Sequence, residues 1–257
     1  MSDIEVAVAD RVATVTLNRP QLRNPMTLAM WQGVARIFGE LGADPGVRAI
    51  ILTGAGGNFS VGADISEFGT VRHTVEQSVA YEEAVDASSD AIQGAGKPTI
   101  AVAQGYCLGG GCHMAMSCDF RFAAPSTVFG IPAARLSIIY GVRSTQRLLA
   151  LVGLTEAKRI LYTADRIDAA RALAIGFAQE VADDPLAAAR AFAGKIAQNA
   201  PLSVSGAKYI LDGLAMGEGA LDVAAAQRLI DEASSSHDYQ EGRRAFAEKR
   251  PPRFEGR

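Results

Sequence analysis

Two glycine-rich loops carry the residues of this chain whose spacing is best suited to chemistry. Residues 54–62 follow the apolar run 49–52, and residues 104–111 follow the apolar run 99–103. A dinucleotide fingerprint in the first loop would need glycine at position 59, where Phe59 stands, and no Gly-Lys-Ser/Thr ends the run as in a P-loop. The loops therefore predict neither kind of nucleotide site.

The second loop has a composition suited to binding negative charge. Gly109, Gly110 and Gly111 stand where a helix is expected to begin, so side chains do not shield its first N–H groups. Such amides, aided by the helix dipole, stabilise negative charge that develops during a reaction. The alternative is that the glycines only permit close backbone packing, and this loop alone does not decide between the two.

His113 follows this loop and has a reference pKa of about 6.5, which suits proton exchange near neutral pH. The other histidines, His73 and His237, are distant in sequence, and the three cysteines fit neither a disulfide framework nor a CxxC zinc pattern. We therefore expect no metal site. Serine-hydrolase chemistry is not expected either, because Asn58 stands before Ser60 where a nucleophile elbow would have its first glycine.

The elements that position these loops alternate between strands and helices. Thr27 is suited to capping a helix, since residues 28–41 place apolar side chains at helical spacing. Further helices are expected over about 73–93, after the second loop, and over most of the chain beyond residue 144, with breaks at Gly153, Gly176 and Pro201. The expected strands are residues 4–8 and 15–17 as a hairpin, then 49–52, 99–103, 120–122, 127–129 and a run near 177–181.

This alternation favours an α/β core. We expect the core to span residues 1–200 and a helical region to span residues 201–257, because the last third is rich in alanine and charged residues at helical spacing.

The composition is that of a globular protein. Of its 257 residues, 49% are hydrophobic and 21% are charged, and a net charge of −3 without a basic stripe argues against nucleic acid as the main partner. No apolar stretch reaches the roughly 18 residues that span a bilayer. The first residues lack the pattern of a signal peptide. We therefore expect a cytoplasmic protein with no membrane partner.

Taken together, the two loops closely resemble the signature loops of the enoyl-CoA hydratase/isomerase (crotonase) superfamily. The matching segments are Phe59-Ser60-Val61-Gly62-Ala63-Asp64-Ile65 and Gly105-Tyr106-Cys107-Leu108-Gly109-Gly110-Gly111-Cys112. The resemblance covers nearly the whole chain, through residues 17–20, 23–24, 49–54, 97–101 and 145–148 to the tail segments 238–242 and 245–250. On these motifs the chain is identified as a member of the superfamily.

Membership implies a spiral of repeated ββα turns followed by a C-terminal helical region that mediates homotrimers, often paired into hexamers. It also implies an acyl-CoA thioester as the ligand, so that coenzyme A arrives as part of the substrate and no cofactor is tightly bound. In this family one backbone N–H from each loop forms an oxyanion hole for the thioester carbonyl. By motif match the two donors are Ala63 and Gly110.

The resemblance also implies where coenzyme A would lie. Phe246 and Lys249 match tail positions that reach its nucleotide end, often in a neighbouring subunit. The family commonly has a basic residue just after Asp-Ile, where this chain has Ser66, so one phosphate contact is expected to be missing. The remaining positions that match the lining of the CoA site are Arg23, Pro25, Val61, Ala63, Asp64 and Ile65.

The chain departs from the family at both catalytic glutamates, since His113 and Ala133 stand at these positions. Adding water to an enoyl bond needs a base and an acid, and losing one such group commonly lowers the rate by about 10²–10⁴-fold. We therefore expect an enzyme that stabilises a thioester enolate but hydrates poorly. Tyr140 falls where methylmalonyl-CoA decarboxylases of this superfamily carry a tyrosine, so a malonyl-type decarboxylase or lyase is one alternative.

Three further alternatives remain open. A non-catalytic acyl-CoA-binding protein would explain the loss of both glutamates. A weak hydratase could use His113 with another side chain or water. A carbon–carbon hydrolase acting on a free diketone would bind no coenzyme A.

Overall fold

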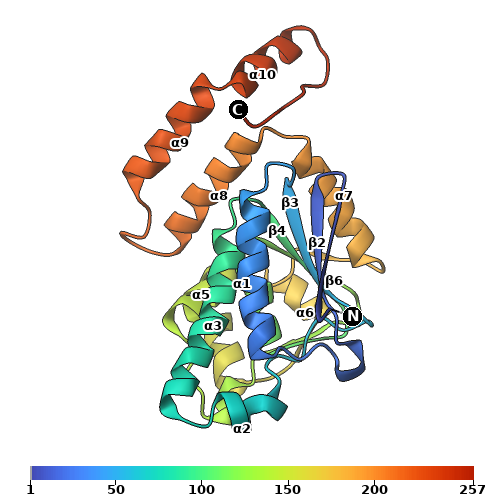
Figure 1. Cartoon of the computed structure of the whole chain (residues 1–257), viewed down its shortest axis with the longest axis vertical. Coiled ribbons are helices and arrows are strands. Elements are labelled where there is room, and N and C mark those ends of the chain that lie inside the picture. The colour runs from blue at the N-terminus through green and yellow to red at the C-terminus, as the bar shows by residue number, and fades with distance from the viewer. Residues whose placement is uncertain (1) are drawn as a thin grey trace.

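The computed structural model describes residues 2–257 and has an α/β core with helices on both sides of a central sheet (Figure 1). The six strands lie in the order β1-β2-β3-β4-β6-β9, with β1 antiparallel to β2 and the others parallel. Their bounds are Ile4–Ala9, Val12–Leu17, Ala49–Gly54, Thr99–Ala103, Phe120–Ala123 and Glu180–Val181. The predicted hairpin and the strands at 49–52, 99–103 and 120–122 are confirmed.

A second, smaller sheet has three short strands in the order β5-β7-β8. β5 (Tyr106–Leu108) pairs in parallel with β7 (Val128–Gly130), which pairs antiparallel with β8 (Ile167–Asp168). The strand predicted near 177–181 shortens to Glu180–Val181, because Ala178 N–H bonds to the Ala172 carbonyl in the turn after a helix rather than to a neighbouring strand.

The helices begin largely where the sequence predicts. Thr27 caps α1, since its Oγ1 accepts a hydrogen bond from the Met30 amide at 3.2 Å. α5 is interrupted at Gly153, whose φ of 73° favours glycine. The helices are α1 Leu28–Ala43, α2 Phe68–Val71, α3 Val75–Gly94, α4 Gly110–Ser117, α5 Val142–Thr163, α6 Ala169–Ala174, α7 Pro185–Ala197, α8 Pro201–Ala215, α9 Val223–Ser235 and α10 His237–Ala247, and the 3₁₀ turns are η1 Pro20–Leu22, η2 Ile65–Glu67 and η3 Ala133–Leu136.

The two faces of the large sheet belong to separate apolar clusters. Alternate side chains of a strand point to opposite faces, so Ile50 and Leu52 join the cluster under α1, α3 and α4. Ile51 faces the other way and packs with Ala189 and Ala193 of α7. The fully buried strands β3 and β4 read as continuous apolar runs for this reason.

One buried charge joins the core elements. The Arg121 guanidinium of β6 donates to the carbonyls of Phe177, Cys118 and Ala115 and to the Gln179 side chain, at 2.6–3.3 Å. Arg121 is 1% exposed, and burial lowers its pKa to about 10. Its charge is satisfied by oxygen atoms of two segments, the end of α4 and residues 177–179, which gives it a structural role.

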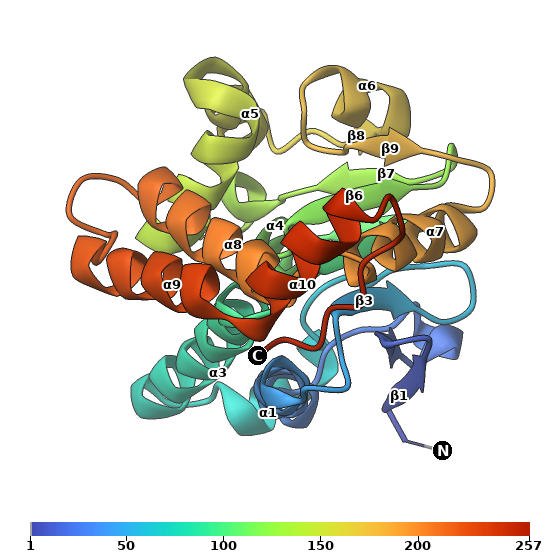
Figure 2. The same ribbon diagram turned by 90° about the horizontal axis from the view of Figure 1, so that it is seen from above.

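The last three helices lie together at one end of the molecule. Figure 2 looks down on α8, α9 and α10 at this end, while α2 lies at the opposite end in Figure 1. α8 begins at Pro201, but the division into a core of 1–200 and a helical region of 201–257 stays a prediction. Within residues 2–257, no helix has both the length and the apolar character required to cross a bilayer.

Candidate active site

The two glycine-rich loops lie side by side and are joined by main-chain hydrogen bonds. The amides of Phe59 and Ser60 donate to the carbonyls of Gln104 and Tyr106 at 2.9 and 3.0 Å, and the Leu108 amide donates to the Ser60 carbonyl at 2.9 Å. These bonds continue the parallel order of β3 and β4 beyond the sheet. Two loops separated by some 45 positions in sequence are thereby held in one fixed arrangement.

The amides of Ala63 and Gly110 meet where the loops join. A methyl group on the Gly110 Cα would lie 3.6 Å from the Ala63 nitrogen, and one on the Gly62 Cα would lie 2.9 Å from the Gly110 nitrogen. Within residues 2–257 neither the Ala63 nor the Gly110 N–H donates a hydrogen bond. Of the neighbouring amides, those of Asp64 and Gly109 are occupied, because they donate to the carbonyls of Met26 and Gly130 at 2.8 Å each. Two adjacent free donors of this kind can bind one oxygen that carries negative charge.

Glycine is required at position 62, just before the Ala63 amide, and at position 110. Gly62 has a φ of 94°, and an added Cβ would also lie 2.9 Å from the Leu108 carbonyl oxygen. A Cβ on Gly110 would lie 2.9 Å from the ring of Trp31, which is held by a hydrogen bond from its Nε1 to the Tyr81 hydroxyl at 2.9 Å. Gly110 is also the first residue of α4, so the helix dipole adds positive potential at its amide.

His113 lies one turn further along α4 and is 6% exposed. Its Nε2 lies 2.7 Å from Oγ of Ser144, near the start of α5. Burial, with a smaller contribution from the positive charge of Arg147, lowers the pKa of His113 to about 4. The imidazole is therefore neutral near pH 7. Ser144 had no signal in the sequence, because it lies 31 positions from its partner and outside any serine motif.

Tyr140 and Ala133 lie on the segment that leads to α5. The Tyr140 ring centroid is 5.8 Å from that of His113, and its hydroxyl is 3.5 Å from the Gly109 carbonyl oxygen, a long contact. Burial raises the pKa of Tyr140, so its hydroxyl keeps its proton at neutral pH. Ala133 is buried at the start of η3 and offers only a methyl group. The structure thus brings His113 and Tyr140 together, with the Tyr140 hydroxyl next to the loop of the free amides.

The predicted CoA positions of the N-terminal part surround the same loops. The backbone of Arg23 is in the left-handed conformation, with a φ of 66°. Its guanidinium lies 5.1 Å from the Tyr106 ring centroid, and its carbonyl accepts a hydrogen bond from the Val61 amide at 3.2 Å. The Pro25 carbonyl accepts a bond from Arg19 at 2.9 Å. Arg23 and Pro25 therefore lie in a segment that hydrogen bonds pair with the loop containing Val61 and Ala63.

The Asp64 carboxylate has partners within the chain. It accepts bonds from the Ser66 hydroxyl at 2.6 Å and from the Arg19 guanidinium at 2.7 Å. These contacts lower the pKa of Asp64, with the Ser66 hydroxyl as the largest cause. Ser66, which stands where relatives carry a basic residue, thus closes a turn at η2 and is itself exposed, as is the Ile65 side chain.

The two tail positions lie away from the loops. Phe246 is 88% exposed on α10 and Lys249 follows this helix, at the end of the molecule opposite η2 and α2 (Figure 1). One chain therefore does not bring Phe246 and Lys249 together with Arg23 and Ala63. The sequence-based expectation that they act from a neighbouring subunit stays a prediction.

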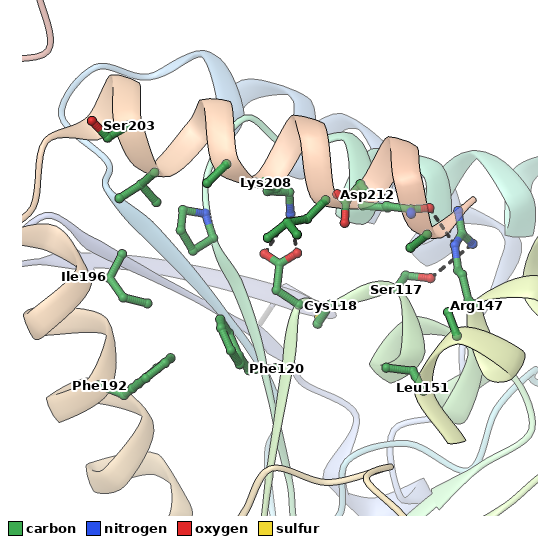
Figure 3. Close-up of a pocket in the computed structure, with 18 of the residues that line it drawn as sticks. Ser117, Cys118, Phe120, Arg147, Leu151, Phe192, Ile196, Ser203, Lys208 and Asp212 are labelled. Atoms are coloured by element: carbon green, nitrogen blue, oxygen red, sulfur yellow. Dashed lines mark hydrogen bonds and ion pairs between the residues drawn. The ribbon is translucent and has the colours of Figure 1, made fainter. Parts of the chain in front are cut away.

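A cavity of about 810 Å³ lies between α5, α7, α8 and the start of β6, apart from the two loops. Figure 3 shows Phe120, Phe192 and Ile196 along one side of it and α8 above, with the Lys208 ammonium paired to Asp119 at 2.8 Å. None of the residues predicted for the active or CoA site lines this cavity. In the described part of the chain, no group of three or more His, Cys, Asp or Glu side chains could hold a metal ion.

Comparison with known proteins identifies the family. The family model described as enoyl-CoA hydratase/isomerase matches residues 8–257. A short-chain-enoyl-CoA hydratase of Clostridium acetobutylicum is 36% identical and covers 93% of this chain and 92% of its own length. A Bacillus subtilis protein named as an enoyl-CoA hydratase/isomerase is 34% identical, over 96% of this chain and 95% of its own.

Solved structures agree with the sequence comparison. The chain is similar to a Hyphomonas neptunium enoyl-CoA hydratase/isomerase family protein, with a TM-score of 0.94, 35% identity, and coverage of 100% of this chain and 98% of that one. An enoyl-CoA hydratase of Bacillus anthracis gives a TM-score of 0.89 at 32% identity, with full coverage of both chains. The spiral α/β fold expected from the resemblance is confirmed. The chain belongs to the enoyl-CoA hydratase/isomerase family, the crotonase superfamily.

Proposed function

We propose that this protein binds an acyl-CoA thioester and stabilises its enolate between the amides of Ala63 and Gly110. The observation that carries the proposal is the pair of adjacent, unpartnered N–H groups on two loops that hydrogen bonds hold together. Backbone donors that are fixed before the reaction need no reorganisation when charge develops on the thioester oxygen. The family membership supports the choice of a CoA thioester.

Efficient hydration does not suit this site. Ala133 cannot exchange a proton, and His113, with a pKa of about 4, is a much weaker base than an ordinary histidine. Only about one His113 ring in a thousand is protonated at pH 7, so it is also a poor acid. Addition of water would need both roles, and the two side chains at the glutamate positions supply neither well.

Decarboxylation of a malonyl-type thioester fits the same residues better. When the bond between the α-carbon and the carboxylate breaks, its electron pair forms the enolate and CO₂ leaves, so no base is needed. The α-carbon then takes one proton, for which the protonated Tyr140 hydroxyl next to Gly109 is a candidate donor, and solvent returns the proton to Tyr140. A site without a carboxylate at positions 113 and 133 also avoids repelling the substrate carboxylate.

We further propose that the protein acts as a homotrimer, or as a hexamer of two trimers. Leu211 and Leu214 of α8 and Val223 and Ile230 of α9 are exposed apolar side chains at the end of the molecule formed by the last helices. Covering them would remove apolar area from water. In such an assembly Phe246 and Lys249 would reach the coenzyme A of a neighbouring subunit, and light scattering coupled to size exclusion tests the stoichiometry.

The reaction is tested by supplying malonyl-CoA, methylmalonyl-CoA and crotonyl-CoA to the purified protein and following products by mass spectrometry. We expect CO₂ loss from a malonyl-type thioester, lowered at least tenfold by Tyr140→Phe, and slow hydration of crotonyl-CoA. Rapid hydration would contradict the proposed reaction. Binding of CoA thioesters without any product would favour a non-catalytic binder, whereas no binding of coenzyme A would contradict the proposal as a whole.

A further inference from the structure

The side chains of His113 and Ser144 form an isolated buried pair. Ser144 is 3% exposed and His113 is 6% exposed, and 2.7 Å separates Oγ from Nε2. In residues 2–257 the Ser144 hydroxyl has no other hydrogen-bond partner. A second buried serine, Ser117, lies on α4. Its hydroxyl donates to the His113 carbonyl at 2.9 Å and makes no hydrogen bond to the ring.

The direction of this hydrogen bond decides which nitrogen carries the proton. A serine hydroxyl has one proton to donate, and leaving a buried donor unpaired costs about 1–3 kcal/mol. Among residues 2–257, the only acceptor within hydrogen-bond distance of the Ser144 hydroxyl is Nε2 of His113. A neutral imidazole that accepts at Nε2 must carry its proton on Nδ1. This atom is not among the fully buried side-chain nitrogens and oxygens that lack a partner in residues 2–257, so an Nδ1–H is not sealed off from solvent as an unpaired Ser144 hydroxyl would be.

The surroundings keep the ring neutral, as this argument requires. The charged groups that face it are Arg147, on the same helix as Ser144, and Asp90 on α3, while Tyr140 faces it as an uncharged ring. Arg147 disfavours a second positive charge, and its guanidinium is already paired with Asp90 at 2.7 Å. Burial acts in the same direction and is the larger cause of the lowered pKa.

We infer that Ser144 is a positioning residue, whose hydroxyl donates to Nε2 of His113 and holds the ring in the tautomer that carries its proton on Nδ1. His113 then offers its site an N–H donor rather than a base. Helical side chains lean toward the N-terminus of their helix, which places this ring on the side of the Gly110 amide. The catalytic consequence rests on the proposed function: the Nδ1–H would donate to the substrate's departing carboxylate or its enolate.

Ser144 is not assigned as a nucleophile. A serine is activated by a base that a third group orients, and in the described residues no side chain bonds to Nδ1 of His113. A ring with a pKa of about 4 also removes a serine proton poorly. The pair therefore differs from a hydrolytic dyad despite its short separation.

The tautomer can be measured without any substrate. In protein labelled with ¹⁵N at histidine, two-bond ¹H–¹⁵N correlation spectra distinguish a ring protonated on Nδ1 from one protonated on Nε2, and His113→Gln identifies the signals. We expect the Nδ1–H pattern at pH 7 in the native protein and in Ser144→Thr, which keeps the hydroxyl. Ser144→Ala should lose that pattern, whereas Ser117→Ala, the matched loss of a buried hydroxyl, should retain it.

An Nε2–H or a doubly protonated ring in the native protein at pH 7 would overturn the inference, and this measurement does not depend on any variant folding. An unchanged tautomer in folded Ser144→Ala would overturn it as well. If a thioester is turned over, Ser144→Ala should lower kcat by about 10–100-fold with little change in KM, and Ser144→Thr should restore most of it. An absence of turnover would refute the proposed function while leaving the tautomer result standing.

Discussion

The burial of His113 makes a quantitative prediction about stability in acid. Folding lowers its pKa from 6.5 to about 4, because the ring is buried and faces Arg147. The unfolded chain therefore takes up a proton at this residue at a higher pH than the folded chain does. The stabilisation is complete above pH 6.5 and is lost as the pH falls toward 4. Between pH 7 and pH 4 the loss amounts to about 3 kcal/mol, since each unit of difference in pKa is worth about 1.4 kcal/mol.

The measurement compares the native protein with His113→Gln, which removes this titration. Unfolding in urea can be followed by the fluorescence of Trp31, the single tryptophan, which is buried in the native state. We expect the free energy of unfolding of the native protein, relative to His113→Gln, to decrease by about 3 kcal/mol between pH 7 and pH 4. Other titrating groups are common to both proteins and cancel in this difference.

A matched control is His73→Gln, because His73 is exposed in the loop before α3. This substitution should leave the pH dependence of stability unchanged. If the difference between the native protein and His113→Gln stays constant from pH 7 to pH 4, His113 is not held as a buried neutral ring. The proton placement inferred for the Ser144 pair would then lose its support as well.

Three other substitutions test the main contacts. Gly110→Ala places a methyl group 2.9 Å from the Trp31 ring and should reduce thioester turnover by about 10²–10³-fold. The control Gly39→Ala places a methyl group where no atom lies within 4 Å, so it should have little effect in the same assay. Arg121→Met leaves several buried carbonyls without a donor and should lower the free energy of unfolding in urea by about 3–5 kcal/mol. The control Arg36→Met, at an exposed arginine, should lower it by less than about 1 kcal/mol. Equal losses in the two variants would show that the Arg121 contacts are not stabilising. Asp64→Ala removes the cap of η2 and the partner of Arg19 and should cost about 1–2 kcal/mol by the same measurement, a loss that an unchanged midpoint would contradict.

The sequence by itself determined the local structure and the family. Strands such as 49–52 and 99–103 are continuous apolar runs because both faces of the sheet are covered, and the helix after Thr27 follows from a capping residue and apolar spacing. The glycines of the two loops are visible in the sequence because no other residue suits a φ of 94° at Gly62 or the space next to Trp31 at Gly110. The position of the predicted donors Ala63 and Gly110 follows from these local constraints.

Only the tertiary structure decided what surrounds those donors. Ser144 meets His113 across two helices, Arg19 reaches the Asp64 carboxylate from 45 positions away in the chain, and the Tyr140 hydroxyl approaches Gly109 from a different segment. The pKa of His113 likewise depends on burial and on Arg147, which lies 34 positions away in the chain. Such contacts depend on how distant segments pack, whereas propensity and periodicity report only on neighbours in sequence, so the chemistry of the side chains could not be read before the fold was known.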